Sequence, residues 1–321
     1  MTSINRVDSV RGVNLASLDL NLLVSLDALL QQRSVTRAAT QMGLSQPALS
    51  ASLARLRRHF GDELLTRVGN EYRLTPLAVQ LKELCRIALS GAERVFTAQP
   101  EFDPASSTRE FTLLVSDYLV AILGQQIAGL LTEEAPGTRL RLTPHSPAMV
   151  ERADQVLLTA DLMFMPHGFL SDLSHHDLYR DEWVCVVAAD NPVVGRGLTV
   201  EDLRTMPWVT TYHGPSATTP AALQMRMLGI EPRITVVNEN FLTVPLLVAG
   251  SERIALLQRR LVERMPLDTG IRVLPPPFEA GQLIEAMWWH PVYDDDPEHA
   301  YLRELVVRAA QRAEHSVRTS V

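Results

Sequence analysis

The sequence contains little of what several classes of protein require. Its only cysteines are Cys85 and Cys185, too few for a disulfide framework or a four-cysteine zinc site, so we expect two buried thiols. No apolar run approaches the roughly 20 residues that span a bilayer. The segment Met1–Ser17 lacks the basic and then apolar layout of a signal peptide. We therefore expect a cytoplasmic protein with no membrane partner.

The sequence motifs of several enzyme classes are missing as well. There is no GxGxxG, no GxxxxGK[ST] and no GxSxG, so nothing indicates dinucleotide, P-loop or hydrolase chemistry. His175-His176 and Asp294-Asp295-Asp296 lack partner ligands at metal-binding spacing, and we interpret both as solvated loops. Redox sensing is disfavoured because Cys85 lies in a predicted helix and Cys185 in a predicted strand. The prediction is a protein that is not an enzyme and has no catalytic residues, cofactor or metal.

Acidic residues are unevenly distributed along the 321 residues, a length that predicts two or three domains. None occurs between Asp27 and Asp62, where five arginines lie. Residues 1–100 carry 12 basic and 8 acidic side chains, a net charge of +4, and the remainder carries 18 and 29, a net charge of −11. A basic N-terminal part on an acidic body suggests that the N-terminal part meets a polyanion. A randomly uneven surface is the alternative that charge alone leaves open.

Three helices with short connections are predicted near the N-terminus. Leucines at helical spacing run through residues 19–32, and a short helix follows over Val35–Met42 and ends at Gly43. The third helix begins after Ser45, its N-cap, with Pro47 in the first turn. Two helices separated by a tight turn, the second polar and basic on its outer face, form a helix-turn-helix.

A short hairpin is predicted directly after the third helix. Leu64–Arg67 and Glu71–Leu74 flank the turn Val68-Gly69-Asn70. The hairpin makes the unit a winged helix-turn-helix. Arg67 and Arg73 would lie on the wing, within reach of phosphates.

The start of the third helix carries side chains suited to reading duplex DNA. Gln46 can bond adenine through two hydrogen bonds, Pro47 and Ala48 suit the thymine methyl group, and Arg55 suits guanine or a phosphate. Backbone N–H groups at this helix start also favour a phosphate. The predicted DNA-contacting residues are Ser34, Thr36, Arg37, Ser45, Gln46, Pro47, Ala48, Ser50, Arg55, Arg67 and Arg73.

A long helix is predicted from Thr75 onward. Its apolar and small residues alternate spacings of four and three, as in a two-stranded packing seam: Leu77, Leu81, Leu84, Ala88, Gly91 and Val95. We favour dimerisation through this helix. Packing of the helix on its own domain is the alternative.

After a polar linker at 102–107, strands and helices alternate. Strands are expected at Glu110–Ser116, Arg139–Thr143, Asp161–Met165, Glu182–Ala188, Trp208–Thr211, Ile234–Val237, Arg253–Leu257, Arg272–Leu274 and Leu283–His290. Helices are expected at Tyr118–Ala135, Pro147–Val156, Val200–Arg204, Pro220–Leu228, Phe241–Ala249 and Pro297–Glu314. This order predicts α/β units with a parallel sheet and crossover helices.

The motifs near the N-terminus and those in the rest of the chain resemble the same protein family. The stretch SVTRAATQMGLSQPALSASLARLRRHFGDELLTRVGNEYRLTP, from Ser34 to Pro76, resembles the DNA-binding domain of LysR-type transcriptional regulators. The layout of the body is similar to the effector domain of that family. The ending AMWWHPVYDDDPEHAYLRELV resembles the branch that responds to flavonoids, nitroaromatics or salicylate-type compounds.

The resemblance implies a multidomain α+β and α/β architecture. A winged helix-turn-helix would span residues 18–75, a linker helix 76–98 and a hinge 99–108. An effector domain like a periplasmic binding protein would then span 109–321. Its two α/β subdomains would comprise 109–166 with 267–321, and 167–266. The family also implies a tetramer, bent promoter DNA and contact with RNA polymerase.

Ligands of such folds bind in the cleft between the subdomains, near the carboxyl ends of strands. Hydroxyl, amide, imidazole and aromatic groups there suit a small aromatic or planar polar molecule. The predicted effector-binding residues are Ser116, Asp117, Tyr118, His145, Pro166, His167, Tyr212, His213, Ser216, Thr218, Asn238 and Phe241.

Some of these residues have a structural alternative. Asp117 is as well placed to cap the following helix as to touch a ligand, and Asn238 and Asn240 are as well placed to cap the helix from Phe241.

The sequence as a whole predicts a transcriptional regulator that binds double-stranded DNA and a small-molecule effector. One alternative is a regulator that binds DNA constitutively, with a cleft filled by its own side chains. Another is a ligand-binding or catalytic body whose helix-turn-helix serves assembly.

Overall fold

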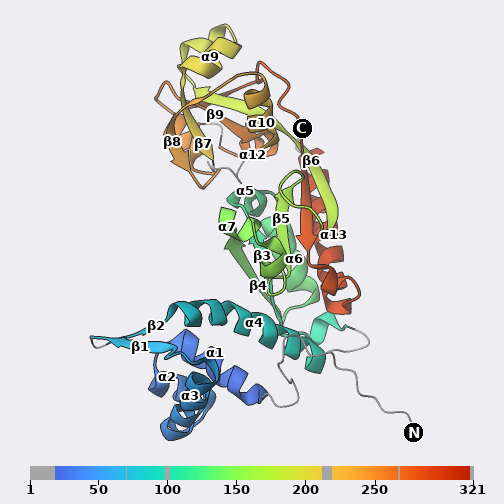
Figure 1. Ribbon diagram of the computed structural model, residues 1–321. Coiled ribbons are helices and arrows are strands. Elements are labelled where there is room, and N and C mark those ends of the chain that lie inside the picture. Colours follow the sequence, from blue (N-terminus) through green and yellow to red (C-terminus); the bar gives the residue numbers. More distant parts are fainter. Residues whose placement is uncertain (1–18, 70, 98–101, 212–218, 267, 319–321) are drawn as a thin grey trace. The chain divides into compact units, whose positions relative to one another are not determined.

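The computed structural model describes residues 19–69, 71–97, 102–211, 219–266 and 268–318. They belong to two compact units, residues 1–98 and 99–321 (Figure 1), which we call the N-terminal and C-terminal units. None of the described helices is both long enough and apolar enough to cross a membrane.

The N-terminal unit is a winged helix-turn-helix followed by a long helix. Its elements are α1 (Leu20–Gln32), α2 (Val35–Met42), α3 (Gln46–Phe60), β1 (Leu65–Val68), β2 (Glu71–Leu74) and α4 (Pro76–Thr97). The sequence signal at the start of α3 is confirmed, because the hydroxyl oxygen of Ser45 caps this helix, and the hydroxyl oxygen of Ser34 caps α2 in the same way. Gly43 ends α2 with a φ of 66°, a left-handed conformation that favours glycine.

The core of this unit comes from the predicted leucine stripes. Leu29, Leu49 and Leu56 are buried together with Ala78 and Cys85 of α4. The first half of α4 therefore packs on its own unit, as the alternative interpretation of this helix proposed. The other side of α4 leaves a line of small and apolar residues exposed: Leu84, Ala88, Gly91 and Val95.

The C-terminal unit contains two α/β subdomains. Its strands are β3 (Glu110–Val115), β4 (Arg139–Pro144), β5 (Leu162–Pro166), β6 (Ser174–Ala188), β7 (Pro207–Thr211), β8 (Arg233–Asn238), β9 (Ile254–Gln258), β10 (Ile271–Leu274) and β11 (Gln282–Trp289). Its α-helices are α5 (Asp117–Leu119), α6 (Gln125–Glu134), α7 (Pro147–Val150), α8 (Ala153–Val156), α9 (Val200–Thr205), α10 (Pro220–Met227), α11 (Val244–Val248), α12 (Arg259–Glu263) and α13 (Pro297–Arg318). Short 3-10 turns are η2 (Pro104–Ser106), η4 (Pro192–Gly195) and η5 (Pro291–Tyr293).

The strands are ordered β4-β3-β5-β11-β6-β9-β7-β8, and β10 also pairs with β6. The expectation of a parallel sheet is correct for β3 with β4 and β5, and for β7 with β8 and β9. It is wrong for β6, β10 and β11, which make antiparallel pairs. The sheet is therefore mixed: β6 runs antiparallel to β9, β10 and β11, and β11 also runs antiparallel to β5.

Strand β6 runs from the first subdomain into the second (Figure 1). Its residues 174–182 pair with β11, and its residues 183–187 pair with β9. Because β10 pairs with Cys185–Ala188, the chain returns to the first subdomain between β10 and β11 rather than near residue 267. The sequence pattern did not predict a strand over the first half of β6, because the polar residues there, including His175-His176, are typical of a loop.

Two predicted helices have a different form in the structure. The helix over 118–135 contains a π-helical turn, η3 (Val120–Gly124), between α5 and α6. The helix expected over Pro147–Val156 consists of two short helices, α7 and α8.

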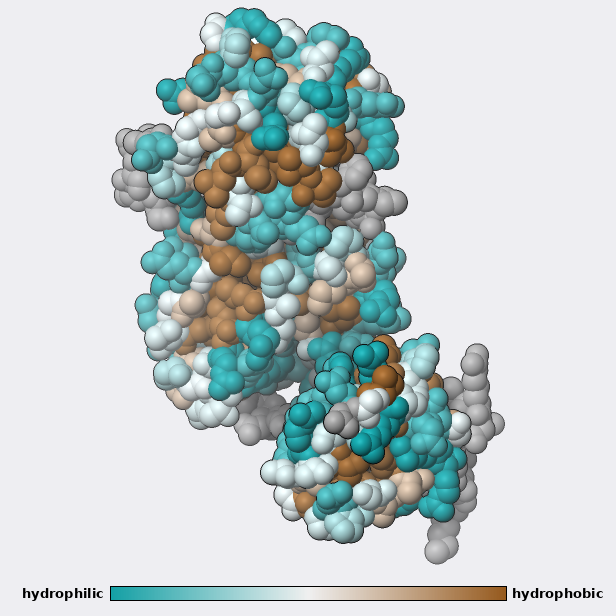
Figure 2. Space-filling view, turned by 90° about the vertical axis from the view of Figure 1, so that its left-hand side faces the viewer, coloured by the Kyte–Doolittle hydropathy of each residue, from teal (hydrophilic) through white to brown (hydrophobic). Residues whose placement is uncertain are grey.

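Figure 2 shows hydrophobic residues of the C-terminal unit gathered in two areas of one face, with more hydrophilic residues between them. Exposed apolar side chains of this unit include Leu142, Val237 and Leu246. Such areas are typical of surfaces that contact another protein.

Candidate functional site

The start of α3 presents its predicted side chains to solvent. Gln46, Pro47, Ala48 and Ser50 are all exposed, while Leu49 between them is buried. The hydroxyl of Ser45 accepts a hydrogen bond from the N–H of Ala48 at 3.4 Å and so holds the first turn. The face that the sequence assigned to base reading is therefore free of the core.

Two arginines near α3 already have partners within the unit. Arg55 forms an ion pair with Asp19 at 3.2 Å, and Asp19 also caps α1. The guanidinium of Arg37 donates to the carbonyl of Gln32 at 2.7 Å, at the end of α1. Both side chains remain exposed, but these contacts give each of them a structural role that the sequence did not predict.

The wing places its two arginines on different faces. In the β1–β2 register Arg67 lies opposite Tyr72, and Arg73 lies opposite Thr66. Since residues directly opposite each other share a face of the hairpin, Arg67 and Arg73 lie on opposite faces. Both are exposed, and Arg67 also donates to the carbonyl of Gly69 at 3.2 Å.

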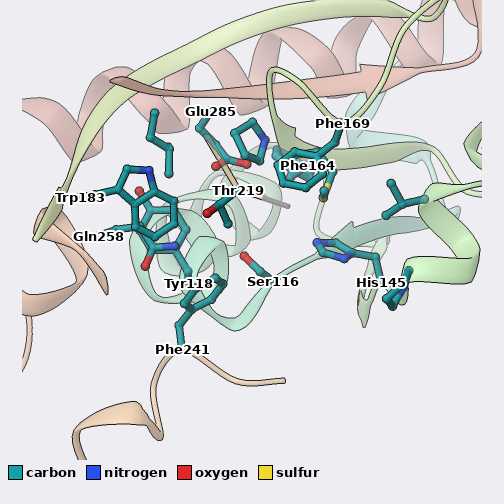
Figure 3. Close-up of a pocket in the computed structure, with 15 residues that line it drawn as sticks. Ser116, Tyr118, His145, Phe164, Phe169, Trp183, Thr219, Phe241, Gln258 and Glu285 are labelled. Atoms are coloured by element: carbon teal, nitrogen blue, oxygen red, sulfur yellow. The ribbon is translucent and has the colours of Figure 1, made fainter. Parts of the chain in front are cut away.

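A pocket lies between the two subdomains of the C-terminal unit, with about 650 Å³ of empty space that is partly open to solvent (Figure 3). It is lined by Ser116, Tyr118, His145, Pro147, Val150, Phe164, Met165, Pro166, Phe169, Trp183, Thr219, Phe241, Gln258, Leu283 and Glu285. Figure 3 shows Trp183, Gln258, Tyr118 and Phe241 towards one side, and Phe164, Phe169 and His145 towards the other. None of these lining residues is a lysine or an arginine.

The pocket wall is mostly apolar but contains two buried polar atoms that have no hydrogen-bond partner among the described residues. They are Nε1 of Trp183 and Oε1 of Gln258. An unsatisfied buried donor or acceptor costs roughly 1–3 kcal/mol, so a native structure rarely keeps one without a reason. Both atoms are shielded from solvent, so a bound molecule uses this donor and this acceptor only after the two side chains move.

Glu285 adds a buried carboxyl group to the same wall. Burial, and to a lesser extent the nearby charge of Asp181, raises the pKa of Glu285 to about 8. The group is therefore mainly protonated at neutral pH, and a protonated carboxyl both donates and accepts hydrogen bonds. Burial also lowers the pKa of His145, which favours a neutral imidazole on the opposite side.

Tyr118 is fixed in the pocket wall by a buried hydrogen bond. Its hydroxyl donates to Asp181 at 2.6 Å, and the other oxygen of Asp181 accepts from the N–H of Glu182 at 2.7 Å. The Tyr118 ring meets the rings of Tyr179 and Phe241 edge to face. Burial raises the pKa of Tyr118, so this hydroxyl remains a donor.

The structure brings part of the predicted effector set into the pocket. Ser116, Tyr118, His145, Pro166 and Phe241 line it. The predicted residues Tyr212, His213, Ser216 and Thr218 lie outside the described residues.

Three predicted residues do not line the pocket and have other contacts. Asp117 accepts hydrogen bonds from the N–H groups of Phe241 at 3.1 Å and Leu242 at 2.8 Å, and so links the two subdomains. Asn238 donates to the carbonyl of Asn240 and to Thr243, which orders the turn before α11. His167 lies beside Asp177, with Nε2 2.6 Å from its carboxylate.

Sequence reasoning missed much of the pocket wall, including Trp183, Gln258 and Glu285. Glu285 had a signal, since it is a single acid within the apolar strand LIEAMWW. Trp183 and Gln258 had none, because they lie far apart in the sequence and meet only through the β6–β9 pairing.

The two cysteines are buried and free, as the sequence predicted. Burial raises the pKa of each thiol to about 12. Both thiols therefore stay protonated at neutral pH, which disfavours redox chemistry.

Comparison with known proteins assigns a family to both units. Residues 20–78 match the model of the bacterial regulatory helix-turn-helix protein of the lysR family, and residues 105–314 match the LysR substrate binding domain. A curated relative, nodulation protein D 2 of Rhizobium tropici, is 33% identical over 297 residues, which cover 91% of this chain and 93% of that protein.

Solved structures share the fold at low sequence identity. A full-length OxyR variant from Pseudomonas aeruginosa matches with a TM-score of 0.67 and 18% identity over 92% of this chain and 95% of that one. Full-length CbnR, solved in a complex with its target DNA, matches with a TM-score of 0.62 and 16% identity over 92% of this chain and 100% of that one.

Proposed function

The chain belongs to the LysR family of DNA-binding transcriptional regulators, and we propose that each of its two units binds a different partner. The N-terminal unit binds operator DNA through the start of α3 and the wing. The C-terminal unit binds a neutral, hydroxylated aromatic effector in the pocket between its subdomains. The chain acts in the cytoplasm, where it can bind both the operator DNA and the effector.

The exposed start of α3 supports the first half of the proposal. Gln46, Pro47 and Ala48 enter the major groove, with Gln46 on an adenine. Arg67 and Arg73, on the two faces of the wing, contact phosphates. The exposed line of α4 pairs two chains, so that two α3 helices meet two half-sites one helical turn apart. That CbnR, a protein of the same fold, has been solved with its target DNA supports this arrangement.

The polarity of the pocket supports the second half and is the observation that carries it. Aromatic rings and aliphatic side chains make up most of the wall and suit a flat apolar ligand. Trp183 and Gln258, after a small movement of their side chains, and the protonated Glu285 offer hydrogen bonds without a net positive charge. A phenolic or flavonoid-like molecule satisfies these groups. An aromatic carboxylate would instead lie near Glu285 with no cation among the lining residues to balance it.

Effector binding changes DNA binding through the two subdomains. A ligand that contacts Phe241 of one subdomain and Tyr118 of the other favours one relative arrangement of the subdomains. In a tetramer that arrangement alters the spacing of the DNA-binding units, and hence the bend of the promoter and its contact with RNA polymerase.

Thermal unfolding against a ligand panel tests the proposal. Neutral phenols and flavonoids at about 100 times their dissociation constant should stabilise the protein by about 2.7 kcal/mol. At about 2–4 °C per kcal/mol, the midpoint then rises by about 5–11 °C. Benzoate-type acids of the same size should give a smaller shift, and Gln258→Met should reduce the shift from phenols.

Constitutive DNA binding without an effector is the competing function, and it predicts a pocket filled by its own side chains. The open pocket between the two subdomains argues against it. If neither phenols, flavonoids nor acids move the midpoint while the protein binds one operator sequence specifically, constitutive regulation replaces the effector proposal.

A further inference from the structure

Two histidines and an aspartate lie together at the start of β6, outside the effector pocket. His175 and Asp177 lie on β6, and His167 follows the end of β5. One ligand atom from each residue lies within 4.8 Å of those of the other two. The sequence did not indicate this group, because His167 is eight residues from His175 and comes close only through the turn between the strands.

The imidazole rings are held in place from behind by Trp288. The ring of His175 stacks on the Trp288 ring at 4.6 Å, and the ring of His167 meets it edge to face at 5.2 Å. Trp288 itself is buried and donates its indole N–H to the carbonyl of Met165 at 2.8 Å. The two rings therefore start from restrained orientations, which lowers the entropic cost of binding an ion between them.

The hydrogen bonds of the group match those of metal ligands. Nδ1 of His175 lies 3.4 Å from the carbonyl of Leu173, a contact that places the proton on Nδ1 and leaves Nε2 with a free lone pair. A ligating histidine commonly donates its second ring N–H to a backbone carbonyl in this way. Nε2 of His167 lies 2.6 Å from Oδ1 of Asp177, so nitrogen and oxygen ligands already face each other.

We propose that His167, His175 and Asp177 bind a divalent transition metal ion of the Zn²⁺ class. Two imidazoles and one carboxylate suit Zn²⁺, Ni²⁺ or Co²⁺ rather than Mg²⁺, which prefers oxygen ligands. Zn²⁺ binds at about 2.0–2.2 Å from each ligand atom, so the His167–Asp177 contact opens slightly and His175 moves inward. Water completes the coordination, because the group is partly exposed.

The position of the site links the ion to the pocket wall. Pro166 lines the pocket and directly precedes His167. An ion bound to His167 and to β6 restrains the end of β5 that carries Pro166. The metal site does not depend on the effector proposal, and its test needs no effector.

Metal titration of the full-length protein, with any affinity tag removed and after treatment with a chelator, tests the site. We expect saturable binding of one Zn²⁺ per chain by calorimetry, and quenching of Trp288 fluorescence by Ni²⁺ that is absent in Trp288→Phe. His167→Ala, His175→Ala and Asp177→Asn should each weaken Zn²⁺ binding by more than about tenfold. Mg²⁺ should give no saturable heat.

His176→Ala is the matched control. His176 is the next residue of β6 and is exposed like His175, but strand geometry places it on the opposite face. Its loss should leave Zn²⁺ affinity unchanged. Circular dichroism of each variant checks that the fold is kept. No saturable binding, or equal weakening by His176→Ala and His175→Ala, would overturn the site, as would binding that survives His167→Ala with His175→Ala.

Discussion

Trp183 and Gln258 are direct cross-strand partners in the β6–β9 pair, and each has a buried polar atom without a partner among the described residues. Trp183 is also the residue at which β6 stops pairing with β11 and begins pairing with β9. The polar end of the pocket therefore lies where the chain passes from one subdomain to the other. Ligands of α/β folds commonly bind at such a change of strand order.

Replacing Gln258 with methionine should separate stability from ligand binding. The change removes a polar group that makes no hydrogen bond through Oε1, so the free energy of unfolding without ligand should stay the same or rise. Affinity for a phenolic effector should fall by about 0.5–1.5 kcal/mol, the worth of one hydrogen bond. Urea unfolding and ligand titration measure the two effects. Gln125→Met, at an exposed position of the same unit, is the control and should change neither.

The carboxyl of Glu285 should make stability depend on pH. Its pKa is raised from 4.5 to about 8 in the folded protein, so between these values the unfolded chain has lost a proton that the native chain keeps. The free energy of unfolding therefore falls as pH rises through this window, by up to about 1.4 kcal/mol per pH unit. Glu285→Gln should remove this slope.

Urea unfolding of both proteins at several pH values between about 5 and 8 measures the difference. The exposed Glu279→Gln is the matched control and should keep the wild-type slope. Parallel curves for wild type and Glu285→Gln would show that Glu285 is ionised in the native state.

Gln46→Ala should lower the selectivity of DNA binding rather than binding as a whole. Loss of a two-hydrogen-bond contact to adenine should reduce discrimination at one base pair by about 1–3 kcal/mol. Titrations on the operator and on operators mutated at single positions measure this. Gln31→Ala, at an exposed position of α1, should keep full discrimination. Equal losses on all sequences would instead assign Gln46 to the phosphate backbone.

Arg67→Ala should weaken binding to every DNA sequence. Each phosphate contact contributes about one unit to the slope of log affinity against log salt, so the slope should become shallower by about one. Arg73→Ala should act in the same way from the other face of the wing. Arg272→Ala, an exposed arginine of the C-terminal unit, is the control. An unchanged slope for Arg67→Ala would remove this residue from the phosphate contacts.

Leu84→Arg should weaken dimerisation through α4. Leu84 is 60% exposed in one chain and belongs to the line that continues through Ala88 and Val95. A buried, unpaired arginine in a two-helix seam is costly. Sedimentation velocity should show a shift towards smaller species. Val79 of the same helix is 58% exposed but lies away from this line, so Val79→Arg should leave the size unchanged. Equal shifts in both variants would point to another interface.

Local sequence patterns were sufficient to predict the N-terminal unit almost to the residue. Caps such as Ser34, Ser45 and Gly43 act within one turn of helix, and the leucine stripe of α3 needs only helical spacing. These interactions join residues that lie close together in the sequence, so local sequence patterns predict them. The ion pair of Arg55 with Asp19 joins α3 to the start of α1 and was not predicted for that reason.

The pocket and the His167 group depend on tertiary structure instead. Trp183 meets Gln258, and His175 stacks on Trp288, only because β6 pairs with β9 and β11 from distant parts of the sequence. Which polar atoms are left unpaired, and which acid is buried, follows from those pairings and not from spacing. The mixed sheet therefore created the chemistry of the C-terminal unit, because burial and antiparallel register brought together residues that no local pattern connects.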